Sequence, residues 1–89
     1  MILKKGEVRQ VGIEVINCLT EDFVIEAADY TIIKEINNQS IEVETGIPII
    51  DKHKILVMFD ASEKGTFYVW LKYHIGPEIY KAKILVEVV

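Results

Sequence analysis

Cysteine, arginine and proline are scarce in this sequence of 89 residues. Cys18 is the single cysteine, which excludes an internal disulfide and leaves a small apolar side chain or a free thiol. Arg9 is the single arginine, and the formal net charge is −4 at pH 7. A chain with this balance has no basic patch that neutralises several phosphates, so nucleic acid is not an expected partner.

Long apolar runs are also missing. Charged side chains interrupt the first ten residues, where a signal peptide needs a continuous apolar stretch, and no later run reaches about 18 apolar residues. We therefore expect synthesis in the cytoplasm without signal-peptide export, and no membrane span. The glycosylation motif at 38–40 has no meaning without export.

No set of side chains has the spacing of a metal or cofactor site. Asp51 and His53 are two residues apart and would share one side of a strand, but a third ligand is missing. His74, the other histidine, belongs to a different expected strand. The glycines form no phosphate-binding loop. We expect neither a metal nor a cofactor.

Candidate catalytic residues lack partners in the same way. Ser62 falls in an expected polar turn, and neither Ser62 nor Ser40 belongs to a G-x-S-x-G elbow. Glu42 and Glu44 are expected on the wet face of one strand, and we interpret them as a solubilising pair. The sequence therefore predicts a protein that is not an enzyme.

What the sequence has in abundance is β-branched side chains. Roughly a third of its residues are isoleucine, valine or threonine, which suit a pleated surface and lose rotamer freedom in helices. Apolar residues alternate with polar ones in six or seven segments, and turn residues separate these segments. The expected strands lie at 2–4, 8–16, 23–34, 41–45, 53–60, 67–75 and 78–88. This pattern predicts a single domain, an antiparallel β-sandwich, with a small barrel as the alternative.

The segment 23–34 is the least certain part of this pattern. Its apolar residues change parity, which predicts a β-bulge near Ala27 and Ala28. Phe23, Ala27 and Tyr30 also have helical spacing, so a helix capped by Thr20 is the alternative.

One strand face carries side chains that are typical of a contact surface. In the expected strand 67–75 they alternate with the inward-facing set and point to solvent: Tyr68, Trp70, Lys72 and His74. Trp and Tyr are enriched at the centres of protein interfaces. Lys81 and Lys83 are expected on the same face of the neighbouring strand. The alternatives are that a loop or the amino-terminal segment covers Trp70, and that the aromatic pair stacks on sugar rings. The free edges of the sandwich offer a second route to association, by strand addition.

The last third of the chain, DASEKGTFYVWLKYHIGPEIYKAKILVEVV, resembles the closing hairpin of bacterial immunoglobulin-like domains. The residues that carry the resemblance are Asp60, Gly65, Thr66, Phe67, Val69, Tyr73, Val86 and Val88. Phe67 departs from the pattern, because many such domains have a tyrosine there whose hydroxyl closes the corner. The resemblance implies an immunoglobulin-like sandwich that serves as a bead in surface proteins or as an accessory part of phage particles. The absence of a signal peptide favours the phage type.

The expected function is therefore that of a non-enzymatic assembly module. Its partner would be protein, either a second copy in a homo-oligomer or a larger structure such as a phage or prophage virion. The alternative is a carbohydrate-binding or adhesion module that uses the same Tyr68 and Trp70 face.

Overall fold

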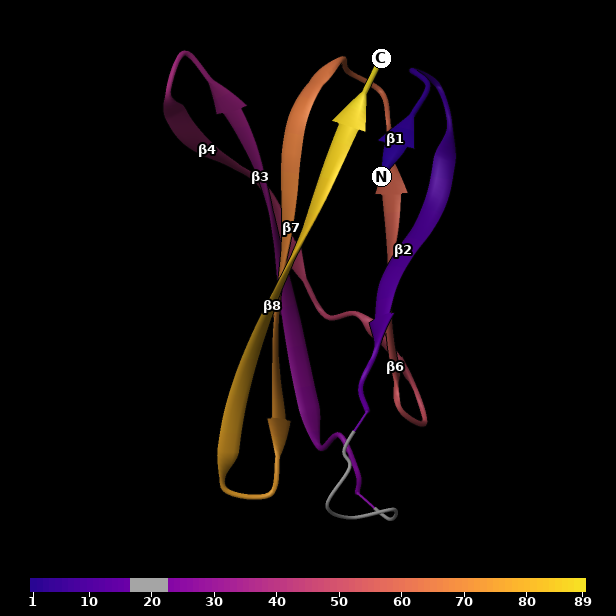
Figure 1. Cartoon of the computed structure of the whole chain (residues 1–89), viewed down its shortest axis with the longest axis vertical. Coiled ribbons are helices and arrows are strands. Elements are labelled where there is room, and N and C mark those ends of the chain that lie inside the picture. The colour runs from indigo at the N-terminus through magenta and orange to yellow at the C-terminus, as the bar shows by residue number, and fades with distance from the viewer. Residues whose placement is uncertain (17–22) are drawn as a thin grey trace.

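The computed structural model describes residues 1–16 and 23–89, and these residues form eight strands in two layers (Figure 1). The strands are β1 (Ile2–Leu3), β2 (Val8–Glu14), β3 (Ala27–Ile36), β4 (Gln39–Gly46), β5 (Ile49–Asp51), β6 (Lys54–Asp60), β7 (Gly65–Ile75) and β8 (Glu78–Val88). The molecule is elongated, with principal extents of 41 × 24 × 21 Å. The β7–β8 hairpin extends along its longest axis (Figure 1).

The strand order identifies the fold. One sheet has five strands in the order β1-β8-β7-β3-β4, and the other has three in the order β2-β6-β5. All neighbours are antiparallel except β1, which runs parallel to β8. Strand β4 extends the sheet that contains the last two strands, β7 and β8, and this is the arrangement of variable-type immunoglobulin domains. The predicted antiparallel immunoglobulin-like sandwich is confirmed, with eight strands in place of six or seven.

The core lies between the inner faces of the two sheets. Strand β6 contributes Ile55, Val57 and Phe59, which alternate with more exposed residues as the sequence predicts. Strand β7 contributes Phe67, Val69 and Leu71 in the same way. The rings of Phe59 and Phe67 meet edge to face across the layers, with centroids 5.4 Å apart. Among the described residues, no buried polar side-chain atom lacks a hydrogen-bond partner.

Two positions of β7 differ chemically from those of an antibody domain. Phe67 occupies the corner position near the start of the strand, where a tyrosine would hydrogen-bond upstream backbone. Val69, two residues later, occupies the position of the second cysteine of the inter-sheet disulfide, and its side chain is fully buried. Apolar packing replaces the covalent bond at this point of the core.

Strand β3 differs from the expected 23–34 strand. It begins at Ala27, which pairs with His74, and Glu26 donates its backbone N–H to the carbonyl oxygen of the same His74 at 2.9 Å. Two successive residues thus oppose one residue of β7, so the bulge predicted near Ala27 and Ala28 lies at Glu26 and Ala27. Ile25 is buried before the bulge, whereas Glu26 and Ala27 are both exposed, which accounts for the change of parity. The helix alternative is wrong for residues 27–36, and its cap Thr20 lies outside the described residues.

Strand β4 corrects a second expectation. The sequence predicts one buried face, yet Ile41 and Val43 are 47% and 54% exposed. The three-stranded sheet is narrower than the five-stranded sheet, so the β4 edge of the five-stranded sheet is left uncovered. The pairing with β3 shifts at Val43, because Glu42 pairs with Ile33 and Glu44 with Ile32. This bulge places Glu42 and Glu44 on opposite faces of the sheet, so the shared wet face predicted for them is wrong.

The amino-terminal residues connect the two layers. Strand β1 pairs with only the last two residues of β8, Glu87 and Val88. The α-ammonium group of Met1 donates a hydrogen bond to the carbonyl oxygen of Leu85 at 3.1 Å. Gly6 then donates its backbone N–H to the carbonyl oxygen of Ala61 at 2.7 Å, where the chain crosses to the other sheet.

Candidate contact surface

The candidate site is the outer face of the five-stranded sheet, the face turned away from β2, β5 and β6. Because cross-strand partners point to the same side of a sheet, the pairing with β7 assigns this face residue by residue. Strand β3 adds Asp29, Thr31 and Ile33 beside Lys72, Trp70 and Tyr68. Strand β8 adds Lys81, Lys83 and Leu85 beside the same three residues. The predicted set Tyr68, Trp70, Lys72 and His74 thus lies on one face, as do Lys81 and Lys83.

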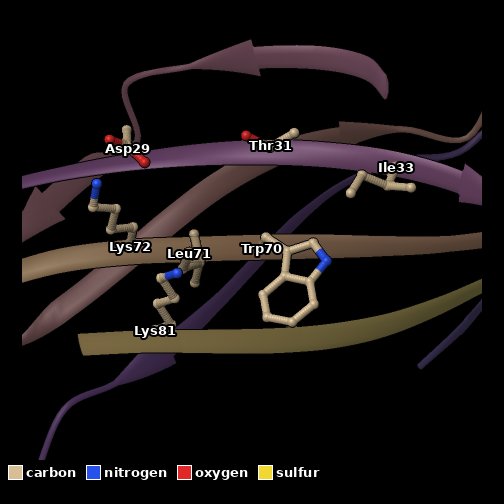
Figure 2. A pocket seen from close by; sticks show the side chains of 7 residues that line it. All are labelled: Asp29, Thr31, Ile33, Trp70, Leu71, Lys72 and Lys81. Atoms are coloured by element: carbon tan, nitrogen blue, oxygen red, sulfur yellow. The ribbon is translucent and has the colours of Figure 1, made fainter. Parts of the chain in front are cut away.

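The centre of the outer face is apolar and partly open. Trp70, the single tryptophan, is 38% exposed, and Leu85 is 41% exposed. Tyr68 and Ile33 are half-buried beside them. Figure 2 shows the Trp70 indole projecting from β7 toward β8. Trp70 is therefore partly open to solvent in the described part of the chain.

A shallow hollow of about 370 Å³ adjoins this apolar centre (Figure 2). The residues that line it come from three adjacent strands: Asp29, Thr31, Ile33, Trp70, Leu71, Lys72 and Lys81. It is an open depression on a sheet, and it holds one carboxylate and two ammonium groups at its rim. The sequence could not identify the β3 residues, since their pairing with β7 joins segments about forty residues apart.

Lys83 lies over both aromatic rings of the face. Its Nζ is 4.4 Å from the centroid of the Tyr68 ring and 5.2 Å from that of the Trp70 ring. A cation this close to an aromatic face is attracted by the ring quadrupole. The ammonium group of Lys83 therefore lies over the rings on which a flat ligand would stack.

Charge on the outer face is divided between its two ends. The basic end holds Lys72, Lys81 and Lys83. The acidic end holds Glu35 and Glu87, which pair with Thr66, and Glu42, which pairs with Ile33. Lys72 and Thr66 are six residues apart on β7, so the basic and acidic ends are separated by about 20 Å along the strand. All six charged side chains are exposed apart from their stems.

The two residues considered as metal ligands are engaged differently. Asp51 ends β5, and His53 lies in the turn before β6. The His53 imidazole stacks on the Phe23 ring, with centroids 4.0 Å apart and planes 14° apart, and its Nε2 is 3.1 Å from the Phe23 carbonyl oxygen. No group of three or more His, Cys, Asp or Glu side chains in residues 1–16 and 23–89 could hold a metal ion.

The remaining candidate residues are dispersed. Ser62 lies in the connection between β6 and β7, and Ser40 lies on the β4 edge. Glu44 accepts a hydrogen bond from the Tyr30 hydroxyl at 3.0 Å. Burial raises the pKa of Tyr30, and the hydrogen bond to Glu44 raises it further. None of these groups adjoins the hollow on the outer face.

Comparison with known proteins gives a likeness in structure only. No family model matches the chain, and no curated protein matches it. A solved structure from work on the "multimeric cell-adhesive interactions of VGSC beta subunits" aligns with 100% of this chain and 89% of its own. The two chains are 14% identical, with a TM-score of 0.47. The fold assignment rests on the strand order described above.

The described part of the chain contains no helix with the length and apolar character required to cross a bilayer.

Proposed function

We propose that this chain is a non-enzymatic module that binds another protein through the outer face of its five-stranded sheet. The observation that carries the proposal is the exposed apolar centre around Trp70, ringed by charged side chains. A partly exposed aromatic cluster inside a polar rim is the usual anatomy of a protein interface. Trp and Tyr are also the residues that most often dominate binding energy.

Carbohydrate is the competing ligand, and the position of Lys83 favours protein. A sugar ring would stack on the faces of Tyr68 or Trp70, where the Lys83 side chain already lies. A protein partner can instead offer a carboxylate to Lys83 and apolar side chains to Leu85 and Trp70. The face supplies both kinds of contact within one surface.

Absence of catalysis is part of the proposal. The groups that acid–base or nucleophilic chemistry would need lie apart: His53 stacks on Phe23, and Ser62 lies in a connecting segment. Among residues 1–16 and 23–89, no convergent acid, base and nucleophile adjoin the hollow beside Trp70.

The setting that we propose is an accessory component of a phage or prophage particle. This part of the proposal rests on the resemblance of residues 60–89 to immunoglobulin-like modules of that kind. In such a particle one small domain contacts neighbouring subunits and needs no chemistry of its own.

The test compares Trp70→Ala with the matched control Met58→Ala. Met58 is 53% exposed on the outside of the other sheet, so the control removes a large apolar side chain elsewhere. Light scattering after size exclusion measures association over a range of concentrations. We expect association that Trp70→Ala abolishes and Met58→Ala keeps, with unchanged circular dichroism in both.

Two results would contradict the proposal. One is association that survives Trp70→Ala. The other is a protein that stays a monomer at every concentration while its tryptophan fluorescence responds to oligosaccharides, which would assign the face to carbohydrate.

A further inference from the structure

We infer that the partner of the outer face is a second copy of this chain, packed face to face with its strands antiparallel. The inference rests on the proposed function and specifies its partner. What supports it is the division of charge between the basic end (Lys72, Lys81, Lys83) and the acidic end (Glu35, Glu42, Glu87).

A symmetric pair of faces is related by a two-fold axis in the plane between them. If the axis runs along β7, each row meets the same row of the second copy with β3 over β8, so the basic end faces the basic end and Glu87 faces Glu35. If the axis runs across the strands, the two ends exchange. The midpoint of the exchange lies between Tyr68 and Trp70, at the centre of the apolar cluster.

The second arrangement brings opposite charges together on β8. Rotation about that midpoint exchanges the Lys72 position with the Thr66 position. On β8, Lys81 then lies opposite Glu87 of the second copy, because these residues pair with Lys72 and Thr66. Two-fold symmetry makes each such pair occur twice.

The remaining positions fit the same arrangement. Trp70 comes opposite Tyr68 of the second copy, and Lys83 opposite Leu85. One contact is unfavourable, since Asp29 comes opposite Glu35, but Lys72 pairs with Asp29 in the same row and supplies a positive charge beside it. The apolar cluster meets itself and the charged ends meet their opposites.

The size of the face is close to what a dimer needs. Strands β4, β3, β7 and β8 at about 4.8 Å spacing, over the roughly 33 Å length of ten residues, give about 600 Å² of flat area. Side-chain relief adds to this value, and a standard interface buries about 800 Å² per partner. Any other protein would have to carry the same two ends at the same separation of about 20 Å.

The experiment reverses one charge at each end. Lys81→Glu alone puts carboxylates opposite Glu87 in both symmetric pairs, and Glu87→Lys alone puts ammonium groups opposite Lys81. We expect each variant to lose about tenfold in dimer affinity, because symmetry removes two exposed ion pairs at once. Both side chains are exposed, so the fold should be unchanged by circular dichroism.

Mixing the two variants is the decisive measurement. In a dimer of one Lys81→Glu chain and one Glu87→Lys chain, both contacts become attractive again. Light scattering should therefore show a dimer on mixing under conditions where each variant alone is a monomer. The control is Lys52→Glu, which changes the net charge equally in the turn between β5 and β6 and should dimerise like the wild type.

The opposite orientation gives the opposite result. With the axis along β7, Glu87 would face Glu35 of the second copy, because both pair with Thr66. Glu87→Lys would then tighten the dimer, which would overturn the inference. An unchanged affinity, or no dimer on mixing, would also overturn it. If Trp70→Ala still abolishes association in those cases, the proposed function stands and only the antiparallel pairing fails.

Discussion

Gly12 lies where β2 approaches β6 most closely, and its substitution by alanine should destabilise the sandwich. A Cβ on Gly12 would lie 2.2 Å from the carbonyl oxygen of Ile55 and 2.8 Å from Cδ2 of Leu56. The Leu56 side chain can rotate away, whereas the carbonyl is fixed in the ladder. Ordinary carbon–oxygen contacts are about 3.3 Å or longer, so the two strands must separate by roughly 1 Å.

The cost of that separation can be worked out by parts. Loss of one ladder hydrogen bond costs about 0.5 to 1.5 kcal/mol. Disturbed packing of the core residues on either side costs about 1 to 3 kcal/mol. The alanine variant has less conformational entropy in its unfolded state than the wild type, which offsets about 0.4 to 1 kcal/mol of this loss of stability. The net loss is about 2 kcal/mol, a large share of the roughly 5 to 13 kcal/mol expected for a domain of this size.

Urea unfolding followed by far-ultraviolet circular dichroism measures this loss. We expect a lower midpoint with an unchanged slope, and a melting temperature reduced by about 8 to 16 °C. The control is Gly76→Ala, where no atom lies within 4 Å and only the backbone angle of +57° opposes the new side chain. Its cost should be about 1 kcal/mol. If Gly12→Ala is as stable as the wild type, or no worse than Gly76→Ala, the close approach does not constrain the strands.

The loss of folding stability in acid should depend on Lys34, whose ammonium group is 2.8 Å from the Glu63 carboxylate. The hydrogen bond and charge of Lys34 lower the pKa of Glu63 below 4.5. The stability that this ion pair contributes is therefore present above pH 4.5 and disappears as pH falls through the pKa of Glu63 in the folded protein. Lys34→Met should therefore lose less stability than the wild type between pH 6 and pH 3, and equal losses in urea midpoint would refute this. Separately, the Tyr30 phenol should ionise above pH 10, and Glu44→Gln should lower its pKa only in part, because burial remains the larger cause. Ring-carbon chemical shifts measure this ionisation, and a Tyr30 pKa at or below 10 in the variant would contradict it.

The spacing of apolar residues along the chain was enough to predict β6 and β7, the strands that face each other across the core. In β6 and β7 the odd-numbered residues from 55 to 59 and from 67 to 75 are all apolar, and Phe59, Val69 and Leu71 among them are buried. The same rule fails for β4. In β4, Ile41 and Val43 alternate with polar residues just as regularly. Burial also requires a second layer opposite the strand, and the sequence of one strand does not determine how wide that layer is.

The contact surface shows the same division between local and distant information. Alternation within one strand was sufficient to place Tyr68, Trp70, Lys72 and His74 on one face. The neighbours Ile33 and Leu85, which complete the apolar centre, depend on the registers of β3 and β8 against β7. The separation of charge into two ends also emerges only from these registers, because Glu35, Glu42 and Glu87 come from three different strands.

The valine at position 69 determines how this sandwich relates to its chemical surroundings. Its two layers are joined by side-chain packing and by the crossing chain, with no sulfur bridge at the place where an antibody domain has one. Folding therefore needs no oxidant, and reducing agents cannot unlock the core. The folding of the domain is therefore not coupled to the oxidation of a disulfide.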